Sequence, residues 1–327
     1  MILFQRKVST DNYGIRKWYY YKRKYPIILE IASLKNEKEI IKMNIQWFPG
    51  HMAKTRRMLS ENLKLVDVVV EILDARIPAS SKNPEIDTII NNKPRVVVLN
   101  KADMADPQVS KEWSRWYKSK GSPVVFADSI KGTGLNQLKD SLKELMKERF
   151  ERDRQKGRIF RPIRTMIVGI PNVGKSTFIN KISGKAVAVT GDKPGVTRAK
   201  QWVRLNPEIE MLDTPGMLWP KFDDEETALN LAFTGAIKDD IMDVTEVAAA
   251  LCEKLADIYP AQLAQRFKLE GIEGLKGYEL LEAAGRKRGC IIAGGEIDIR
   301  RISIIMLDEF RGGKIGKLSL ERPQQDM

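Results

Sequence analysis

Cysteine and histidine are scarce in this 327-residue sequence, which has Cys252, Cys290 and a single histidine, His51. Two cysteines are too few for a disulfide framework or a four-cysteine zinc site, and one histidine excludes metal sites built from several. Long apolar runs are also missing: residues 25–34, the longest early run, contain Glu30 and fall well short of the roughly 20 residues that cross a bilayer. Since no secretory cleavage pattern is visible either, we expect a soluble chain from a reducing compartment, without a membrane partner.

Acidic residues are under-represented relative to basic ones. The net charge is +13, with 43% hydrophobic and 30% charged residues, a composition typical of a folded chain. Lys and Arg outnumber Asp and Glu by 10 to 4 in residues 1–42 and by 24 to 15 in residues 43–165, so the excess lies in the first half. A basic surface of this size favours a polyanionic partner, but charge alone does not identify it.

The first 42 residues differ from the rest. They are basic and rich in aromatics, as at Trp18-Tyr-Tyr-Tyr21, and show little periodicity. Three interpretations stay open: an extension upstream of a start at Met43, a transit peptide, or an RNA-binding arm whose rings stack on bases.

Strand-like and helix-like runs alternate after Met43. The expected strands lie at residues 66–73, 95–99, 123–127 and 164–168, with a hairpin at 201–205 and 208–212. Helical patterns lie between them, at 110–120, 135–154 and 177–183. We predict an α/β fold with a mostly parallel sheet and helices on both faces. After residue 223 only helical runs follow, at 225–236, 244–259, 278–286 and 299–310. The length favours two domains, which we place at residues 43–222 and 223–327.

A phosphate-binding motif, Gly-Ile-Pro-Asn-Val-Gly-Lys-Ser, occupies residues 169–176 between an expected strand and an expected helix, the context that a P-loop requires. Gly174 lets successive N–H groups turn toward phosphate oxygens, and the helix N-terminus adds positive potential. Lys175 would reach the β- and γ-phosphates, and the Ser176 hydroxyl would complete the coordination of Mg²⁺. The predicted binding residues here are Asn172, Val173, Gly174, Lys175, Ser176 and Thr177.

The base is indicated by Asn100-Lys101-Ala102-Asp103, directly after the expected strand at 95–99. A carboxylate such as Asp103 can accept hydrogen bonds from N1–H and the exocyclic amine of guanine, whereas adenine would leave buried polar groups unpaired. Asn100 would brace the loop and the Lys101 stem would lie over the base. Asp128 and Ser129, which follow the next strand, would add backbone contacts to the guanine oxygen. The nucleotide is therefore predicted to be GTP.

Two further segments complete the phosphate end. Asp213-Thr-Pro-Gly216 follows the expected strand at 208–212, so that Asp213 can hold Mg²⁺ through water and the Gly216 N–H can sense the γ-phosphate. Thr197 is the candidate for a second Mg²⁺ hydroxyl, on a loop ordered by the γ-phosphate. The alternative is an ordinary threonine in a Pro-Gly turn.

The guanine-recognising motifs precede the P-loop, whereas the usual GTPase order is the reverse. With this order the chain resembles a circularly permuted GTPase, and specifically the ribosome biogenesis GTPase A (YlqF/RbgA) family. The resemblance covers residue 43 to about residue 323, and the matching motifs are Trp47-Phe-Pro-Gly-His-Met52, Asp74-Ala-Arg-Ile-Pro78, residues 100–103, 169–176, 194–197 and 213–216, and Arg311-Gly-Gly-Lys314. It implies a cytoplasmic GTPase that helps to mature the large ribosomal subunit, with the C-terminal domain contacting ribosomal RNA.

The catalytic side chain is less clearly indicated. Met217 occupies the position where many GTPases have a water-orienting glutamine. His51, which we expect in a turn, is a candidate because the resemblance implies a catalytic histidine in the Phe-Pro-Gly-His motif; a purely positional role stays open. By the same resemblance Asn172 would coordinate K⁺ and so supply positive charge to the phosphates, the alternative being an asparagine that braces the loop.

We therefore expect a GTPase, a monomer, that acts at a late step of large-subunit assembly with turnover stimulated by the ribosome. The alternative is a GTP-gated RNA-binding scaffold with negligible hydrolysis. The residues after 226 carry a small acidic excess, so their basic character is confined to clusters at residues 286–288, 300–301 and 311–317. Gly312-Gly313 between cations would suit a loop close to a phosphate backbone.

Overall fold

The computed structural model describes residues 49–91, 93–158, 161–184, 201–214, 216, 218 and 224–323, with residues 49–55 and 201 as backbone only. The basic extension at 1–42 and Thr197 lie outside this part of the chain. Among the described residues there are eleven α-helices and one six-stranded sheet. None of these helices is both long enough and apolar enough to cross a bilayer.

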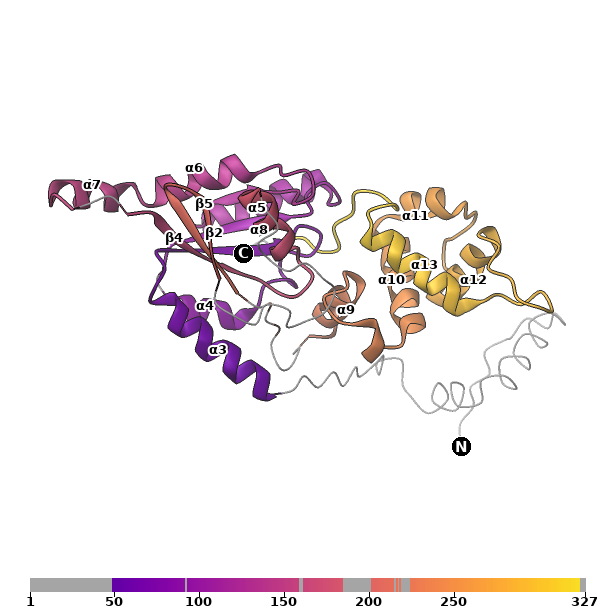
Figure 1. Cartoon of the computed structure of the whole chain (residues 1–327). Helices are drawn as coiled ribbons and strands as arrows, with labels where there is room; N and C mark the ends of the chain where they lie inside the picture. The colour runs from indigo at the N-terminus through magenta and orange to yellow at the C-terminus, as the bar shows by residue number, and fades with distance from the viewer. Residues whose placement is uncertain are drawn as a thin grey trace, which may run out of the picture. The chain divides into compact units, whose positions relative to one another are not determined.

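The sheet has the strand order β3-β2-β1-β4-β6-β5 (Figure 1). Its neighbours pair in parallel except for β5, which runs antiparallel to β6 at one edge. The predicted parallel sheet and terminal hairpin are both confirmed. The bounds are Val68–Asp74 (β1), Arg95–Asn100 (β2), Val124–Phe126 (β3), Ile163–Val168 (β4), Gln201–Asn206 (β5) and Ile209–Asp213 (β6).

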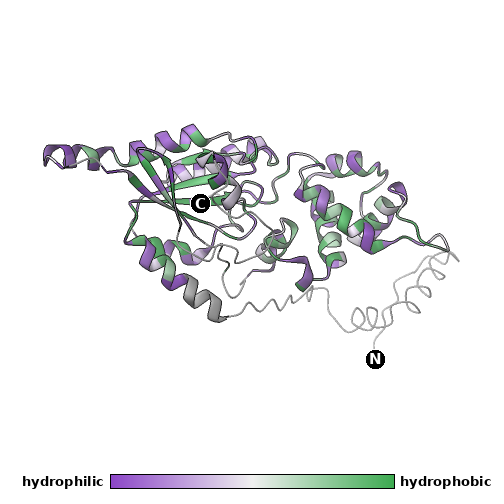
Figure 2. Cartoon of the chain, in the orientation of Figure 1, coloured by the Kyte–Doolittle hydropathy of each residue, from purple (hydrophilic) through white to green (hydrophobic). Residues whose placement is uncertain are grey.

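Helices cover both faces of the sheet, and the central strand β1 is therefore buried along its whole length. Its residues Val68, Val70 and Ile72 pack with α6 and α8, whereas Val69 and Leu73 face the side of α3, α4 and α5. Figure 2 shows hydrophobic residues along the inner strands of the sheet. The helices are α3 (Pro49–Leu63), α4 (Pro84–Ile90), α5 (Pro107–Ser119), α6 (Leu135–Leu145) and α8 (Lys175–Ser183).

Three local predictions were wrong. The helix expected at 135–154 is interrupted at Met146, which has φ −100° and ψ 0° and is buried. Before it, Leu138 and Leu142 of α6 face the core, whereas α7 (Lys147–Gln155) buries no residue. The fully buried face ends at Met146, and α7 contributes to the same core through the partly buried Phe150.

The second error concerns the Gly50-His51 dipeptide, expected in a turn. Both residues belong to the first turn of α3, which begins at Pro49. Proline is favoured in the first turn because its φ is already helical and the missing N–H has no partner there. The α4 helix begins in the same way, with Pro84 at its first position, and was not predicted.

After the sheet the chain forms helices only. These are α9 (Glu225–Phe233), a 3₁₀ turn (Asp239–Ile241), α10 (Val244–Ile258), α11 (Pro260–Phe267), α12 (Gly277–Lys287) and α13 (Ile299–Arg311). Helix α11 was not predicted. The helix expected to end at residue 236 ends at Phe233 instead. Gly235 leaves the helical conformation with φ +75°, and its N–H donates to the Ala232 carbonyl. The buried residues of these helices continue the core that starts on one face of the sheet.

Candidate nucleotide-binding site

The predicted site residues come together at the carboxyl ends of the parallel strands. The P-loop follows β4, the Asn100–Asp103 turn follows β2, Asp128 and Ser129 follow β3, and Asp213 ends β6. In open parallel sheets ligands bind at this edge. The order of the strands therefore brings motifs far apart in the sequence to one place.

The P-loop has the backbone that its glycines and asparagine suggest. Gly169, Asn172 and Gly174 have φ values of 155°, 57° and 97°, of which those of Asn172 and Gly174 lie in the left-handed region that side chains disfavour. Lys175 is buried, and its ammonium donates to the Ile170 carbonyl over 2.7 Å. Burial lowers the pKa of Lys175 to about 8, and the negative charge of Asp213 opposes this shift only in part. A phosphate group arriving here would meet a poorly solvated cation.

Asn100 links the base-recognising turn to the P-loop. Its Nδ2 donates to the Val173 carbonyl over 2.8 Å, and its Oδ1 accepts from the Ser129 hydroxyl over 2.6 Å and from the Ser129 N–H over 3.2 Å. A Cβ atom on Gly174 would lie only 2.4 Å from Asn100 Nδ2, so a glycine is required at this contact as well as for its φ. The bracing role predicted for Asn100 thus has a geometric basis.

The other residues predicted to recognise the base lie in the turns after β2 and β3. Asp103 is partly exposed in the turn after β2, and Ala102 N–H bonds the Ala127 carbonyl. The Asp128 carboxylate accepts from the Ile130 and Lys131 N–H groups, which shapes its own turn. Thr177 lies in the first turn of α8.

Lys101 makes two polar contacts at once. Its ammonium lies 3.0 Å from the Asn172 carbonyl and 3.0 Å from Asp74 Oδ2. Burial alone would raise the pKa of the Asp74 carboxyl, but the charges of Arg76 and Lys101 hold it well below its usual range. Asp74 is thus an anion that orients the lysine of the guanine motif.

Arg76 extends this contact to the last helix. Its Nε and Nη2 bind both oxygens of Asp74, and its Nη1 donates to the Phe310 carbonyl over 3.1 Å at the end of α13. Asp74 and Arg76 were named in the sequence only as part of a family motif. The signal for a structural role was an acidic residue ending a fully buried strand, two positions before an arginine.

The phosphate end is closed by the turn after β6. A Cβ on Gly216 would lie 2.8 Å from Lys175 Nζ and 2.9 Å from the Pro171 nitrogen, so Gly216 touches the P-loop. Asp213 is buried at the end of β6. Thr214 donates its hydroxyl to the Ile167 carbonyl, which holds this turn against β4.

The hydroxyl of Ser176 and the carboxylate of Asp213 are hard oxygen donors of the kind Mg²⁺ prefers. Ser176 lies at the start of α8 beside Lys175, whose pKa the charge of Asp213 affects. The two residues therefore fit the Mg²⁺ ion that accompanies nucleoside triphosphates.

The P-loop also faces the C-terminal helices. Asn172 Nδ2 donates to the Gly235 carbonyl over 2.7 Å, just after α9. A cavity of about 800 Å³ lies here. It is lined by P-loop residues including Lys175 and Ser176 and by Thr234, Gly235, Asp239 and Arg311. Arg311, predicted in an RNA-facing cluster, instead binds both oxygens of Asp239 at 2.7 Å.

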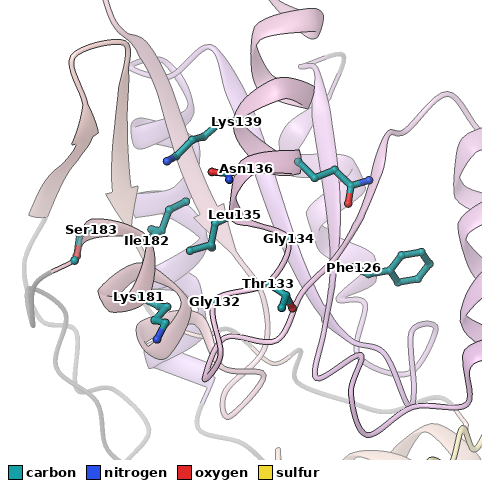
Figure 3. Close-up of a pocket in the computed structure, with 12 residues that line it drawn as sticks. Phe126, Gly132, Thr133, Gly134, Leu135, Asn136, Lys139, Lys181, Ile182 and Ser183 are labelled. Carbon is teal, nitrogen blue, oxygen red and sulfur yellow. The ribbon is translucent and has the colours of Figure 1, made fainter.

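A second hollow of about 580 Å³ lies between the start of α6 and the end of α8 (Figure 3). Leu135 and Ile182 lie near each other within it, and Lys139 and Lys181 lie on its border. None of the predicted nucleotide-binding residues lines it, so it is separate from the P-loop cavity.

Comparison with known proteins agrees with this geometry. Residues 164–266 match the family model described as 50S ribosome-binding GTPase. Ribosome biogenesis GTPase A of Bacillus cereus is 50% identical over 284 residues, which cover 86% of this chain and 95% of that protein. The chain belongs to the ribosome biogenesis GTPase A family.

As a member of the ribosome biogenesis GTPase A family it is a GTPase, and more distant relatives agree. Mitochondrial ribosome-associated GTPase 1 of mouse is 33% identical over 297 residues, covering 85% of this chain and 90% of that protein. Among solved structures, GDP-bound TM YlqF matches with a TM-score of 0.62 and 30% identity, over 82% of this chain and all of that one. The predicted circularly permuted GTPase fold is thereby confirmed.

Proposed function

We propose that this GTPase binds GTP through Asp103 and the P-loop and hydrolyses it during a late step of large ribosomal subunit assembly. The observation that carries the nucleotide part is the Asn100 bridge, which joins Ser129 and Val173 at 2.6 and 2.8 Å and so fixes the base and phosphate ends relative to each other. The ribosomal part is supported by the relatives, which are named for ribosome biogenesis. We also propose that the protein is a cytoplasmic monomer.

In this proposal Ser176, Thr197 and Asp213 hold Mg²⁺ on the phosphates, where the ion would neutralise charge that develops during hydrolysis. Asn172 is the proposed K⁺ ligand. Its Nδ2 is engaged with Gly235, and this bond leaves its amide oxygen as the donor for a cation. Gly216 would sense the γ-phosphate, because it lies against Lys175 and Pro171.

We further propose that hydrolysis alters the C-terminal helices. Only residues 217–224 separate Gly216 from the first residue of α9, so a change at the γ-phosphate has a short path to that helix. The Asn172–Gly235 contact at the end of α9 gives a second one. Domains at 43–222 and 223–327 would be the two bodies that move.

The proposed RNA-contacting surface consists of exposed cations at the end of α12 and the start of α13. They are Arg286, Lys287, Arg300 and Arg301. Arg288 is in a different position, since it binds Glu309 over 2.9 Å. Arg311 is bound to Asp239, so the 311–317 cluster contributes Lys314 and Lys317 instead. Such cations would contact phosphates and bring a strong dependence on salt.

The direct test is GTP hydrolysis with and without purified large ribosomal subunits, in K⁺ and again in Na⁺. We expect subunits to accelerate turnover and Na⁺ to remove much of the effect. GTP-dependent binding of subunits without acceleration would favour the scaffold alternative. His51 is tested by His51→Ala, which should abolish the stimulated rate but preserve GTP affinity; an unchanged stimulated rate would exclude a catalytic role.

A further inference from the structure

The segment after α13, residues 313–322, returns to the turn after β2 that carries Asp103. We call it the C-terminal strap. Leu318 N–H donates to the Met104 carbonyl over 2.9 Å, next to Asp103. Two residues on, Leu320 N–H donates to the Arg76 carbonyl over 2.8 Å. The strap is thus hydrogen-bonded to the loops that follow β1 and β2.

The strap is also held by buried apolar side chains. Ile315, Leu318 and Leu320 are buried, at 6%, 1% and 4% exposure. Gly313, with φ +68°, approaches Met104 so closely that a Cβ there would lie 2.9 Å from Met104 Cγ. Apolar burial of this kind contributes about 1.5–3 kcal/mol for each large side chain, which is enough to hold the strap in place.

Three hydrogen bonds among Asp106, Ser319 and Tyr259 hold the chain just after the turn that carries Asp103. Asp106 N–H donates to the Ser319 hydroxyl over 3.1 Å, and Ser319 N–H donates to the Tyr259 hydroxyl over 3.2 Å. The Tyr259 hydroxyl in turn donates to Asp106 Oδ2 over 3.2 Å. Asp106 Oδ1 is used to cap α5. The Asp106 carboxylate therefore cannot change position without breaking several hydrogen bonds.

From these contacts we infer that the C-terminal strap is a specificity-determining element that positions Asp103 for guanine. The strap bonds Met104 and Asp106, whereas Asn100 and Lys101 fix the turn from the P-loop side. Asp103 lies between the two sets of contacts and is joined to Met104 by a planar peptide. Discrimination by a carboxylate requires the two hydrogen bonds to be placed accurately. Tyr259 and Ser319 are thus positioning residues.

The experiment compares affinities for GTP and for inosine triphosphate (ITP), which lacks the exocyclic amine. In the double variant Ser319→Ala/Tyr259→Phe, affinity for GTP should fall about tenfold and affinity for ITP only about threefold, so that the ratio between them shrinks. A control in the same strap is Arg322→Ala. Arg322 is exposed and its guanidinium donates to the Glu112 carboxylate, not to the turn that carries Asp103, so this variant should keep the wild-type ratio.

A general loss of stability would lower both affinities by the same factor, so an unchanged ratio would overturn the inference. If the double variant does not fold, Tyr259→Phe alone gives the same test, with a smaller expected change. The inference rests on the proposed role of Asp103, which Asp103→Asn tests separately. An unchanged GTP-to-ITP ratio in Asp103→Asn would refute that role. A changed ratio there, together with no change in the strap variants, would refute the strap alone.

Discussion

The Lys101 ammonium lies 3.0 Å from the Asp74 carboxylate, so the lysine of the guanine motif is paired with the residue that ends the central strand. Asp74 in turn binds Arg76, which donates to the end of α13. From α13 the path continues through Arg311, whose Nε donates to the Phe233 carbonyl, and returns to the P-loop at the Gly235–Asn172 bond. A chain of polar contacts therefore links Lys101, α13 and the P-loop.

Asp74→Asn should destabilise the protein strongly. It leaves the buried Arg76 and the half-buried Lys101 without their shared anion, and breaking one side of a buried ion pair typically costs about 3–5 kcal/mol. Chemical denaturation would measure the change in the free energy of unfolding. The matched control is Asp153→Asn on α7, where Asp153 pairs with the exposed Arg158 at 2.9 Å and with Arg149 at 3.6 Å. A solvent-facing pair contributes at most about 1 kcal/mol, so equal losses in the two variants would contradict the proposed network.

The motifs were the most predictable part of the site, because each states its own chemistry. Binding of a nucleotide constrains the positions of the P-loop glycine and lysine and of the asparagine that braces the next turn. The strand order brings these residues together. The network behind them was not predictable. Nothing local in Ser319 or Tyr259 indicates that they meet at Asp106, since these contacts join residues 60 to 213 positions apart in sequence.

Charge patterns were less informative than motifs. Arg311 was assigned to an RNA-facing cluster because cations surround it, yet its partners are Asp239 and the carbonyls of Ala232 and Phe233. Similarly, Gly313, two positions after it, approaches the protein's own Met104. A run of cations in a sequence does not distinguish a side chain that caps helices from one that faces solvent.

Binding of GTP should weaken as the pH rises through about 8. Burial lowers the pKa of Lys175 to about 8 in the nucleotide-free protein, so above this value the lysine is largely neutral and must regain a proton to bind phosphate. Affinity should be nearly constant below pH 7 and fall by up to about tenfold for each unit above 8. Isothermal titration between pH 6.5 and 8.5 would measure this. In Lys175→Arg, whose side chain stays charged, binding should be weaker but independent of pH in this range.

Two substitutions of Asn172 should separate its proposed roles. Asn172→Ala removes both the oxygen available to K⁺ and the donor to Gly235, whereas Asn172→Asp keeps an oxygen but loses the donor that lies 2.7 Å from the Gly235 carbonyl. We expect the K⁺ dependence of hydrolysis to disappear in the alanine variant and to persist in the aspartate variant. The contact with Gly235 should be lost in both, which amide hydrogen exchange at the end of α9 would detect as reduced protection. Persistence of the K⁺ effect in Asn172→Ala would exclude this residue as the ligand.

Gly174→Ala should reduce GTP affinity far more than Gly184→Ala at the other end of α8. Both glycines have positive φ, 97° and 67°, so each alanine pays a similar backbone penalty of about 1 kcal/mol. They differ in their surroundings: a Cβ at residue 174 would lie 2.4 Å from Asn100 Nδ2, whereas nothing lies within 4 Å of one at residue 184. The alanine at 174 must displace Asn100 and with it the bonds to Val173 and Ser129. Overpacking of this kind costs about 1–3 kcal/mol, which as lost binding energy is about tenfold or more. Fluorescent GTP titration of both variants would decide, and equal losses would show that backbone strain alone, and not the Asn100 contact, determines the cost.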